Sequence, residues 1–462
     1  MNDFVSIFRN RYRNNSNQIG NHPIIQENEL LYSSELPLQT YGDDRIKYQN
    51  GTELLASLKL GILAIPAWLR NEITRISFST AMHSLMPDDG KKQIFLWSDL
   101  QAASLIDTFK QSDLAEHFYL ISGTPIHAMS PFAKLLYFQT SEKYPTDTRW
   151  YGIKELVMDY FTGEAVVDYA TASATGLFDL RKKQWSSEIL DYLRIKEEQL
   201  APLADTDQVF EMLPEKRRFF GFPDTTQVVV GASDGTLAAY ASYYSTGRTA
   251  SLTIGTSAAV RQISKNIYLD QKKQNFCYYL KKELLVCGAP SNNGGVVLAW
   301  AAEQLAENPA TFYERLPNLL AQTALGANGL RFWPYLNGER APYWNNKIKG
   351  GFRDLTLQHT RNDMLRSVLE GILLNIRQLV KLVAENEELS ISGGFFQTTA
   401  LGQLAADIFA TKCYYTQENE PIFGLYYLLE QPTRMIEESQ QIFLPNLGNS
   451  TAYEKIAKNY FE

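Results

Sequence analysis

The sequence predicts an α/β protein built from two domains. Its 462 residues exceed what one hydrophobic core normally organises, which favours two domains of comparable size. In the second half of the chain, short apolar segments end in glycine and are followed by apolar residues at helical spacing. This alternation of strand, glycine turn and helix is typical of an α/β domain.

The first half opens with an unusual stretch and then becomes regular. Residues Phe8–Pro23 read FRNRYRNNSNQIGNHP, rich in Asn and Arg and without apolar periodicity, which favours an irregular or disordered segment. The pattern then predicts one amphipathic helix at Leu54–Leu69 and a short buried strand at Arg75–Thr80. Helical spacing recurs at Phe132–Phe138 and at Trp150–Phe161.

The later strands are expected to end in glycine, as strands do when they deliver a loop to a site. These strand-and-glycine units are Gln227–Gly231, Ala250–Gly255 and Leu389–Gly394. The helices expected after them are Gly294–Leu305, Asn362–Glu385 and Leu401–Phe409. A run of small and polar residues near 240–249 marks the predicted boundary, which gives domains at 1–242 and 243–462.

Charge excludes some classes of partner. The formal net charge is −7, so no basic surplus exists to neutralise the phosphates of a nucleic acid or an anionic membrane. Small anionic ligands stay possible, because helix N-termini and a few local cations can hold them. The longest apolar stretch, Leu60–Leu69, contains a proline and is too short to span a bilayer.

The cysteines predict a reducing environment. The three of them, Cys277, Cys287 and Cys413, match no zinc or redox motif, and we expect free buried thiols and no metal site. The first residues lack the apolar segment of a secretory signal. We therefore expect a cytoplasmic protein.

Glycine turns point to a phosphate-binding site. The chain contains neither a P-loop nor a Gly-x-Gly-x-x-Gly motif. It does contain Gly255-Thr256, Gly294-Gly295 and Gly393-Gly394, where glycine allows the backbone N–H groups to approach a phosphate. Each turn alone is better explained as a plain tight turn, but three of them in one domain favour a nucleotide site.

Asp234 is the candidate catalytic base. It stands in Gly-Ala-Ser-Asp-Gly-Thr directly after a predicted strand. An Asp in such a loop is often only a turn residue or a helix cap. As a functional group, it would accept the proton of a substrate hydroxyl while that oxygen attacks a γ-phosphate.

Other candidates have two possible roles each. His83 follows a strand and is either a structural histidine or a ligand contact. Trp97 and Asp99 would pack against and hydrogen-bond a sugar, or form a core Trp beside a capping Asp. Arg340 is a loop cation that either forms a structural ion pair or meets the substrate.

Together these segments resemble the FGGY carbohydrate kinases, from about Ser34 to Gly424 and in family order. The resemblance implies two ribonuclease-H-like domains of the actin and Hsp70 ATPase type flanking a cleft. TAMHS resembles the sugar-contacting turn, with Ala81 in place of Gln, and implies that Met82 and His83 bind substrate. FLWSDLQA resembles the element carrying Trp97 and Asp99, with Gln101 where arginine is usual. An unrelated actin-like ATPase would leave both motifs without a purpose.

The same resemblance implies ATP and Mg²⁺ as cofactors and assigns the nucleotide residues. GASDGT resembles the catalytic loop, which makes Asp234 the base. The motifs TIGTSA, NNGGVVLAW and ISGGFFQTTALGQLAADI resemble the phosphate, third nucleotide and adenosine elements. They assign nucleotide contacts to Gly255, Thr256, Gly295, Gly393, Gly394 and Thr398.

One longer stretch implies the substrate. GERAPYWNNKIKGGFRDLTLQHTRNDMLRSVLEG, which contains Arg340, is similar to the gluconate kinases of the family. Gluconate would be phosphorylated on its terminal hydroxyl to give 6-phosphogluconate. Xylulose or another polyol is the alternative substrate, and a catalytically silent sugar- or nucleotide-binding relative is the alternative role. The resemblance also implies a homodimer.

The front end departs from the family. Its members open with Gly-Ile-Asp-Ile-Gly-Thr-Thr, in which the Asp helps hold Mg²⁺ and the turn grips the γ-phosphate. This chain reads FRNRYRNNSNQ at Phe8–Gln18, although a one-base shift of its degenerate codons permits Phe-Gly-Ile-Asp-Ile-Gly-Thr-Thr-x-Thr-Lys. We expect two compensating indels in the coding DNA, an absent or irregular first strand, and an impaired kinase.

Overall fold

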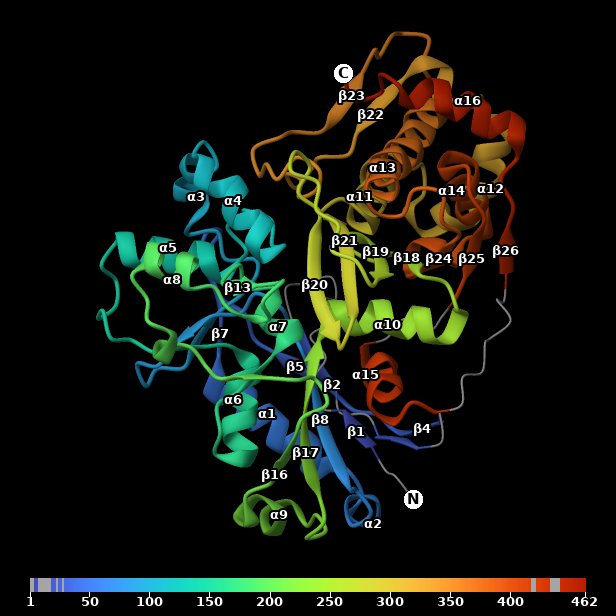
Figure 1. Ribbon diagram of the computed structural model, residues 1–462. Coiled ribbons are helices and arrows are strands. Elements are labelled where there is room, and N and C mark those ends of the chain that lie inside the picture. Colours follow the sequence, from blue (N-terminus) through green and yellow to red (C-terminus); the bar gives the residue numbers. More distant parts are fainter. Residues whose placement is uncertain (1–3, 7–17, 22–23, 27–28, 417–420, 433–440) are drawn as a thin grey trace. The chain divides into compact units, whose positions relative to one another are not determined.

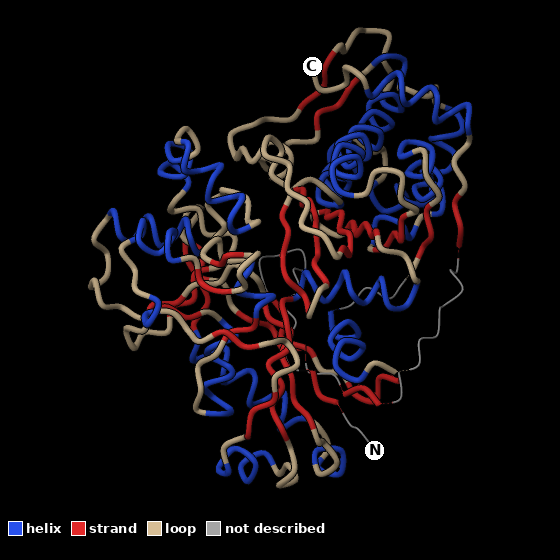
Figure 2. The backbone as a smooth tube through the Cα atoms, in the orientation of Figure 1, coloured by secondary structure: helices blue, strands red, loops and turns tan. Residues whose placement is uncertain are grey.

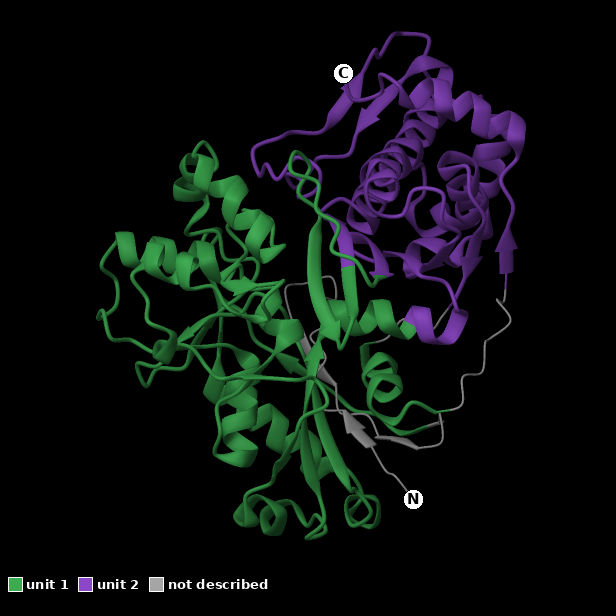
Figure 3. Ribbon diagram, viewed as in Figure 1, with its two compact units in different colours: residues 1–241, 264–286, 420–434 green, residues 242–263, 287–419, 435–462 purple. Residues whose placement is uncertain are grey.

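The computed structural model describes the chain except residues 1–3, 7–17, 22–23, 27–28, 417–420 and 433–440, with side chains from residue 30 on. Two compact units make up the fold (Figure 3). Unit 1 comprises residues 1–241, 264–286 and 420–434. Unit 2 comprises residues 242–263, 287–419 and 435–462. Both units are α/β, as the sequence predicts (Figures 1 and 2).

A six-stranded sheet forms the centre of unit 1. Its order is β16-β17-β8-β1-β3-β4, and β1 and β17 both pair with β8 in parallel. The strands are β1 Phe4–Ser6, β3 Ile24–Gln26, β4 Glu29–Tyr32, β8 Arg75–Thr80, β16 Val209–Glu211 and β17 Gln227–Ser233. Five of the six residues of β8 are buried, because helices and loops cover both of its faces.

The expectation of an absent or irregular first strand is wrong. β1 is a regular strand in which Phe4, Val5 and Ser6 pair with β8 in parallel register. The ladder between β1 and β8 is formed by backbone groups, which every non-proline residue carries. Within the segment expected to be irregular, β2 (Gln18–Asn21) pairs with β5 (Glu35–Leu38), while residues 7–17 lie outside the described part.

Two predicted helices of unit 1 have different limits in the structure. The helix expected at 54–69 is divided into α1 (Gly51–Ala64) and α2 (Ala67–Arg70). Pro66 causes the break, since it holds the preceding Ile65 in an extended conformation, with ψ 131°. The segment expected to be helical from Trp150 begins as a short strand, β11 (Trp150–Tyr151), and α6 (Ile153–Thr162) starts after Gly152.

The other elements of unit 1 cover the sheet or extend from it. The remaining helices are α3 Ala103–Phe109, α4 Asp113–Ser122, α5 Pro131–Thr140, α7 Tyr169–Ser173, α8 Ser187–Leu193, α9 Pro214–Phe220 and α15 Pro421–Glu430. Short strands are β6 Tyr41–Gly42, β7 Lys47–Asn50, β9 Met86–Pro87, β10 Gln93–Phe95, β12 Val167–Asp168, β13 Phe178–Asp179, β14 Gln184–Trp185, β15 Leu203–Ala204 and β20 Phe276–Lys281. The chain passes into unit 2 within α10 (Asp234–Thr246).

Unit 2 is built on strands in the order β19-β18-β24-β25-β26. β18 pairs in parallel with β24, and β24 with β25, which is the pairing expected of strands connected by helices. The strands with residues in this unit are β18 Ala250–Ile254, β19 Ala258–Ser264, β21 Leu284–Ser291, β22 Arg331–Trp333, β23 Gly351–Arg353, β24 Leu389–Ser392, β25 Cys413–Tyr415 and β26 Gln441–Phe443. Of these, β19 and β21 also have residues in unit 1.

Helices flank these strands. They are α11 Gly295–Gln304, α12 Phe312–Gln322, α13 Arg361–Val383, α14 Thr399–Phe409 and α16 Leu447–Ala457. α13 has 23 residues, most of them buried, and packs against β22. The strand and helix positions predicted for this half are confirmed. All three cysteines are free and buried, as expected. Within the described residues, none of the helices combines the length and apolar character that crossing a membrane requires.

Gly371 tests the packing of α13 on β22. Alanine normally stabilises a helix by about 1 kcal/mol relative to glycine. A Cβ on Gly371 would overlap the carbonyl oxygen of Phe332, which is backbone and cannot swing away. We therefore expect Gly371→Ala to lower the free energy of unfolding by about 1–3 kcal/mol in urea titrations.

The matched control is Gly394→Ala, because nothing lies within 4 Å of a Cβ at that position. Its unfolding free energy should stay within about 0.5 kcal/mol of the parent chain. A stabilised Gly371→Ala variant would contradict the close packing of α13 on Phe332.

Candidate functional site

The candidate base lies at the junction of a buried strand and a helix. β17 ends at Ser233, and Asp234 is the first residue of α10. The hydroxyls of Ser233 and Thr236 are 2.7 Å apart, and the backbone N–H of Gly235 donates to Oδ1 of Asp234 at 2.8 Å. The half-buried Asp234 carboxylate thus stands at a helix N-terminus, where the helix dipole favours a negative charge.

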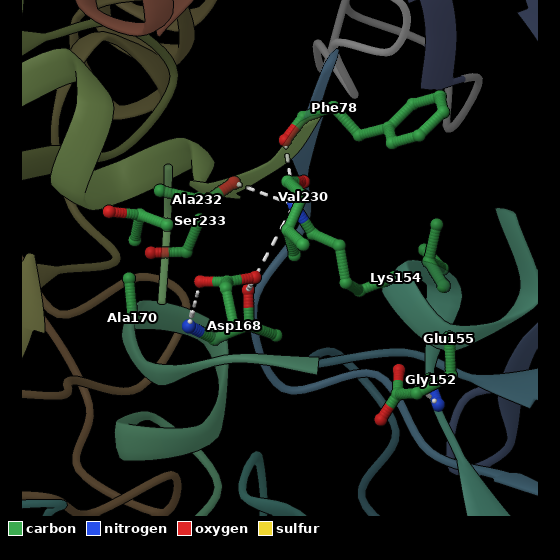
Figure 4. Close-up of polar contacts among 12 residues, drawn as sticks. Phe78, Gly152, Lys154, Glu155, Asp168, Ala170, Val230, Ala232 and Ser233 are labelled. Atoms are coloured by element: carbon green, nitrogen blue, oxygen red, sulfur yellow. Dashed lines mark hydrogen bonds and ion pairs between the residues drawn. The ribbon is translucent and has the colours of Figure 1, made fainter. Parts of the chain in front are cut away.

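A buried lysine holds the strand that carries Asp234. The ammonium of Lys154 donates to the carbonyl oxygens of Phe78 on β8 and Val230 on β17, both at 2.7 Å (Figure 4). Its side chain is fully buried and forms an ion pair of 3.3 Å with Asp168, which is equally buried. Burial lowers the pKa of Lys154, and the carboxylate of Asp168 opposes that shift. The lysine therefore joins the two parallel strands just before their loops begin.

The strand register changes at the same place. The β8–β17 ladder shifts between Val229 and Gly231, and Gly231 has φ +80°. A Cβ on Gly231 would overlap the carbonyl of Phe78, so the bulge requires glycine. The first glycine of the GASDGT motif thus has a packing role.

The structure brings the segment TAMHS and the loop GASDGT of unit 1 together. The Met82 side chain lies against Gly235, where an added Cβ would overlap its terminal methyl group. Met82 and Asp234 therefore belong to one local site. Because the overlap involves the flexible end of Met82, the contact places the two segments side by side but does not by itself require glycine at position 235.

His83 is held in an unusual conformation beside this site. It is a non-glycine residue with φ 65°, a left-handed conformation that costs free energy unless its surroundings hold it. Its Nδ1 lies 2.7 Å from the carbonyl oxygen of Ala174, and its ring meets Tyr278 edge-on at 6.1 Å. Strain held in this way is frequent at ligand sites.

Asp99 lies in the interior of unit 1, fully buried. Its Oδ2 accepts hydrogen bonds from the backbone N–H of Lys47 at 3.0 Å and from Nε2 of Gln101 at 2.9 Å. Asp99 does not cap a helix in the structure, because the N-cap of α3 is Ala102; its bonds hold it to β7 and to Gln101 instead. Trp97 is half-buried two residues away. Contact of either side chain with substrate stays a prediction.

Lys134 was missed by the sequence reasoning. Its fully buried ammonium donates to the carbonyl oxygens of His83, at 3.2 Å, and of Met129. Burial lowers the pKa of Lys134 to about 7, and the charge of Asp99 acts in the opposite direction. The available signal was a lone lysine inside the apolar helix-forming run PFAKLLYF.

In unit 2, two predicted phosphate turns are in direct contact. The N–H of Gly295 donates to the carbonyl of Gly255 at 2.7 Å, and the N–H of Val296 donates to that of Thr256 at 3.1 Å. A Cβ on Gly295 would lie 2.5 Å from the Gly255 oxygen, so only glycine fits. Space beside Gly255 itself is open, with nothing within 4 Å of an added Cβ.

The third turn lies at the end of the neighbouring strand. Gly393 has φ +98°, and a Cβ there would overlap the carbonyl of Ile254, the last residue of β18. Gly394 opens onto free space, and Thr398 precedes α14 as its cap without a side-chain capping bond. The glycine turns predicted from separate parts of the sequence thus form one cradle of backbone groups within unit 2. Within this cradle the N–H groups of Gly255, Gly295 and Val296 donate to protein carbonyls, while space is open beside Gly255 and Gly394.

Arg340 belongs to unit 2 and lies against the strand that precedes α11. Its Nη2 donates to the carbonyl oxygen of Ser291, the last residue of β21, at 3.0 Å. The predicted sugar loop and the predicted nucleotide turn are therefore neighbours inside one unit.

The described residues contain no group of three or more His, Cys, Asp or Glu side chains placed to hold a metal ion. The family's Mg²⁺-holding aspartate corresponds to the Phe8–Gln18 stretch, of which residues 8–17 lie outside the described part.

Comparison with known proteins identifies the class. Residues 28–241 match the N-terminal domain and residues 250–425 the C-terminal domain of the FGGY family of carbohydrate kinases. The gluconokinase of Bacillus subtilis (strain 168) is 32% identical over 380 residues, covering 77% of this chain and 74% of that protein.

Two solved structures from Lactobacillus acidophilus are similar over nearly their full length. A ligand-bound xylulose kinase has a TM-score of 0.90 at 26% identity, covering 100% of this chain and 97% of that one. A gluconate kinase has a TM-score of 0.89 at 26% identity, covering 99% and 96%. The class is thus that of the two-domain sugar kinases. The chain belongs to the FGGY family of carbohydrate kinases.

Lys134 makes the stability of this protein depend on pH. Its pKa is lowered from 10.5 to about 7 in the folded state. Above that value the unfolded chain binds a proton that the folded chain does not, so the free energy of unfolding rises with pH. Relative to Lys134→Met, the parent chain should gain up to about 1.4 kcal/mol per pH unit between about pH 7 and about pH 9.

Urea unfolding of both proteins across this pH range measures the difference. Methionine has similar length and no charge, so the buried volume is retained. Parallel pH profiles of the unfolding free energy for the two proteins would contradict a lowered pKa of Lys134 in the folded state.

Proposed function

We propose that this kinase phosphorylates gluconate on its terminal hydroxyl to give 6-phosphogluconate. The observation that carries the proposal is the stretch from Gly338 to Gly371, which contains Gly-Glu-Arg-Ala-Pro-Tyr-Trp and Leu-Thr-Leu-Gln-His-Thr-Arg. The similarity to the gluconokinase of Bacillus subtilis supports it.

In the proposed reaction, Asp234 accepts the proton as the sugar oxygen attacks the γ-phosphate of ATP. Sugar contacts are assigned to unit 1 and unit 2 side chains that the sequence singled out, namely Met82, His83, Trp97, Asp99 and Arg340. Arg340 is a suitable partner for the carboxylate of gluconate, since its guanidinium forms paired hydrogen bonds with such groups.

ATP would be held by the backbone cradle of unit 2. The residues assigned to it are Gly255, Thr256, Gly295, Gly393, Gly394 and Thr398. When bound, Mg²⁺ neutralises charge on the phosphates. The contribution of the chain itself is to position the phosphates against the open backbone at Gly255 and Gly394 and to remove a proton at Asp234.

Xylulose is the second candidate substrate, favoured by the likeness to a xylulose kinase over the whole chain. We further propose that residues 1–242 bind the sugar and residues 243–462 the nucleotide. A cytoplasmic location and a homodimer stay predictions.

Substrate identity is tested by ADP release with gluconate, xylulose and glycerol, together with calorimetric binding of each sugar. We expect gluconate to bind most tightly and to give the highest kcat/KM. Asp234→Asn should lower kcat about a hundredfold or more, because a general base is lost, and change gluconate affinity only a few-fold. Preference for xylulose would refute gluconate, and an unchanged kcat in Asp234→Asn would refute the base.

We also propose that the segment Phe8–Gln18 limits the rate. Replacing it with Phe-Gly-Ile-Asp-Ile-Gly-Thr-Thr-Ser-Thr-Lys would restore a carboxylate for Mg²⁺ and a turn for the γ-phosphate. Turnover of gluconate should then rise on the order of a hundredfold or more, while gluconate affinity changes little. Equal turnover by the two chains would show that the segment is not limiting.

A further inference from the structure

Glu339, directly before Arg340, is the most heavily hydrogen-bonded carboxylate in the described part of unit 2. Its side chain is completely buried. Oε1 accepts from the backbone N–H groups of Asn292 and Arg340, both at 2.8 Å. Oε2 accepts from Ser291 Oγ and Asn375 Nδ2, both at 2.7 Å, and from Asn293 Nδ2 at 3.2 Å.

These partners favour an ionised carboxylate. Four of the five are N–H groups that can only donate. The orientation of the Asn293 amide is supported independently, because its Oδ1 accepts from the N–H of Asn337 at 3.3 Å. Burial raises the pKa of Glu339 above its usual value, and the hydrogen bonds oppose that shift without cancelling it.

Four of the donors come from two segments that are far apart in the sequence, Ser291–Asn293 and the loop with Arg340, and the fifth, Asn375, lies on α13. Further bonds join the same loops: Ala341 N–H donates to the Pro290 carbonyl at 3.0 Å, and Asn293 Nδ2 to the Gly338 carbonyl at 2.7 Å. The loop that carries Arg340 and the turn that leads into α11 are thereby joined at the buried carboxylate.

The same turn continues to the nucleotide cradle. Gly294 follows Asn293, and a Cβ on it would lie 2.8 Å from the Ser257 carbonyl. Gly295 then bonds to Gly255. A continuous series of contacts therefore links Arg340 to the candidate phosphate cradle within unit 2. It passes through the side chain of Glu339 and then through the backbone at residues 292–295.

We propose that Glu339 is a positioning residue that couples the Arg340 loop to the nucleotide-binding turn. Nucleotide bound at Gly255 and Gly295 orders the turn at residues 291–295. Through the hydrogen bonds of Glu339, residues 337–345 become ordered as well. This order places the guanidinium of Arg340 where it can bind the sugar acid. The proposal rests on the assigned nucleotide and sugar sites and adds a physical link between them.

Glu339→Gln is the sharpest test because it changes charge and donor pattern at nearly constant shape. Both oxygens of Glu339 receive at least two donors, so an amide NH₂ at either place faces N–H groups. We therefore expect the hydrogen bonds between residue 339 and the turn at residues 291–293 to weaken.

A matched control exists in the same unit. Glu370 on α13 is also buried and accepts at Oε1 from Arg366 Nε at 2.7 Å, Tyr453 Oη at 2.8 Å and Gly326 N–H at 3.0 Å. None of these partners belongs to the two loops. Glu370→Gln therefore reports the general cost of altering a buried glutamate.

The experiment measures amide hydrogen exchange of the full chain with and without Mg-ADP, in the parent and both variants. In the parent, Mg-ADP should slow exchange about fivefold or more both at residues 294–297 and in the loop 337–345. In Glu339→Gln, protection should persist at 294–297 and disappear from 337–345. In Glu370→Gln both regions should stay protected.

Steady-state kinetics gives a second readout. Glu339→Gln should raise KM for gluconate about tenfold or more with a smaller change in KM for ATP, whereas Glu370→Gln should change neither.

Three results would each overturn a different part of the proposal. Loop protection that survives in Glu339→Gln, or is missing in the parent while the turn is protected, overturns the coupling alone. Lack of Mg-ADP protection at 294–297 in the parent overturns both the nucleotide assignment and the coupling. Failure to bind gluconate would reject the proposed substrate but leave the exchange result valid.

Discussion

The site of unit 1 depends on the buried ammonium of Lys154. It holds β8 and β17 together through carbonyl oxygens at the ends of both strands, and Asp168 balances its charge. Isolated buried charges are costly, and removal of one partner of a buried pair typically costs about 3–5 kcal/mol. The loops with Met82 and Asp234 follow directly after these strand ends, so their separation depends on this contact.

Local signals in the sequence were sufficient to predict the positions of many helices and strands. Strands that end in glycine, such as Leu389–Gly394, combine β-branched residues with a turn residue, and both are visible within a few positions. The helix limits at Pro66 and Gly152 differ from the prediction because apolar periodicity continues across the residues where a helix ends, at Ile65-Pro66, or begins, after Gly152. Boundaries depend on single residues, whereas periodicity averages over many.

The supporting residues could not be predicted in this way. Lys154 and Phe78 are 76 residues apart, and only the folded sheet brings them together. The role of Glu339 could not be predicted for the same reason, since its donors include residues of β21, the following turn and α13. A lysine or glutamate in a sequence is most often on the surface. Only burial, which is a property of the fold, distinguishes these from the others.

The short strand β1 has an evolutionary consequence. Its place in the sheet comes from backbone pairing with β8 and requires no particular side chains downstream. Side-chain changes that leave this backbone pairing intact leave the strand in the sheet, so they do not by themselves produce the unfolded chains on which chaperones and proteases act. Selection for a well-folded protein and selection for turnover act on different parts of this chain, so a lineage could lose one while it retains the other.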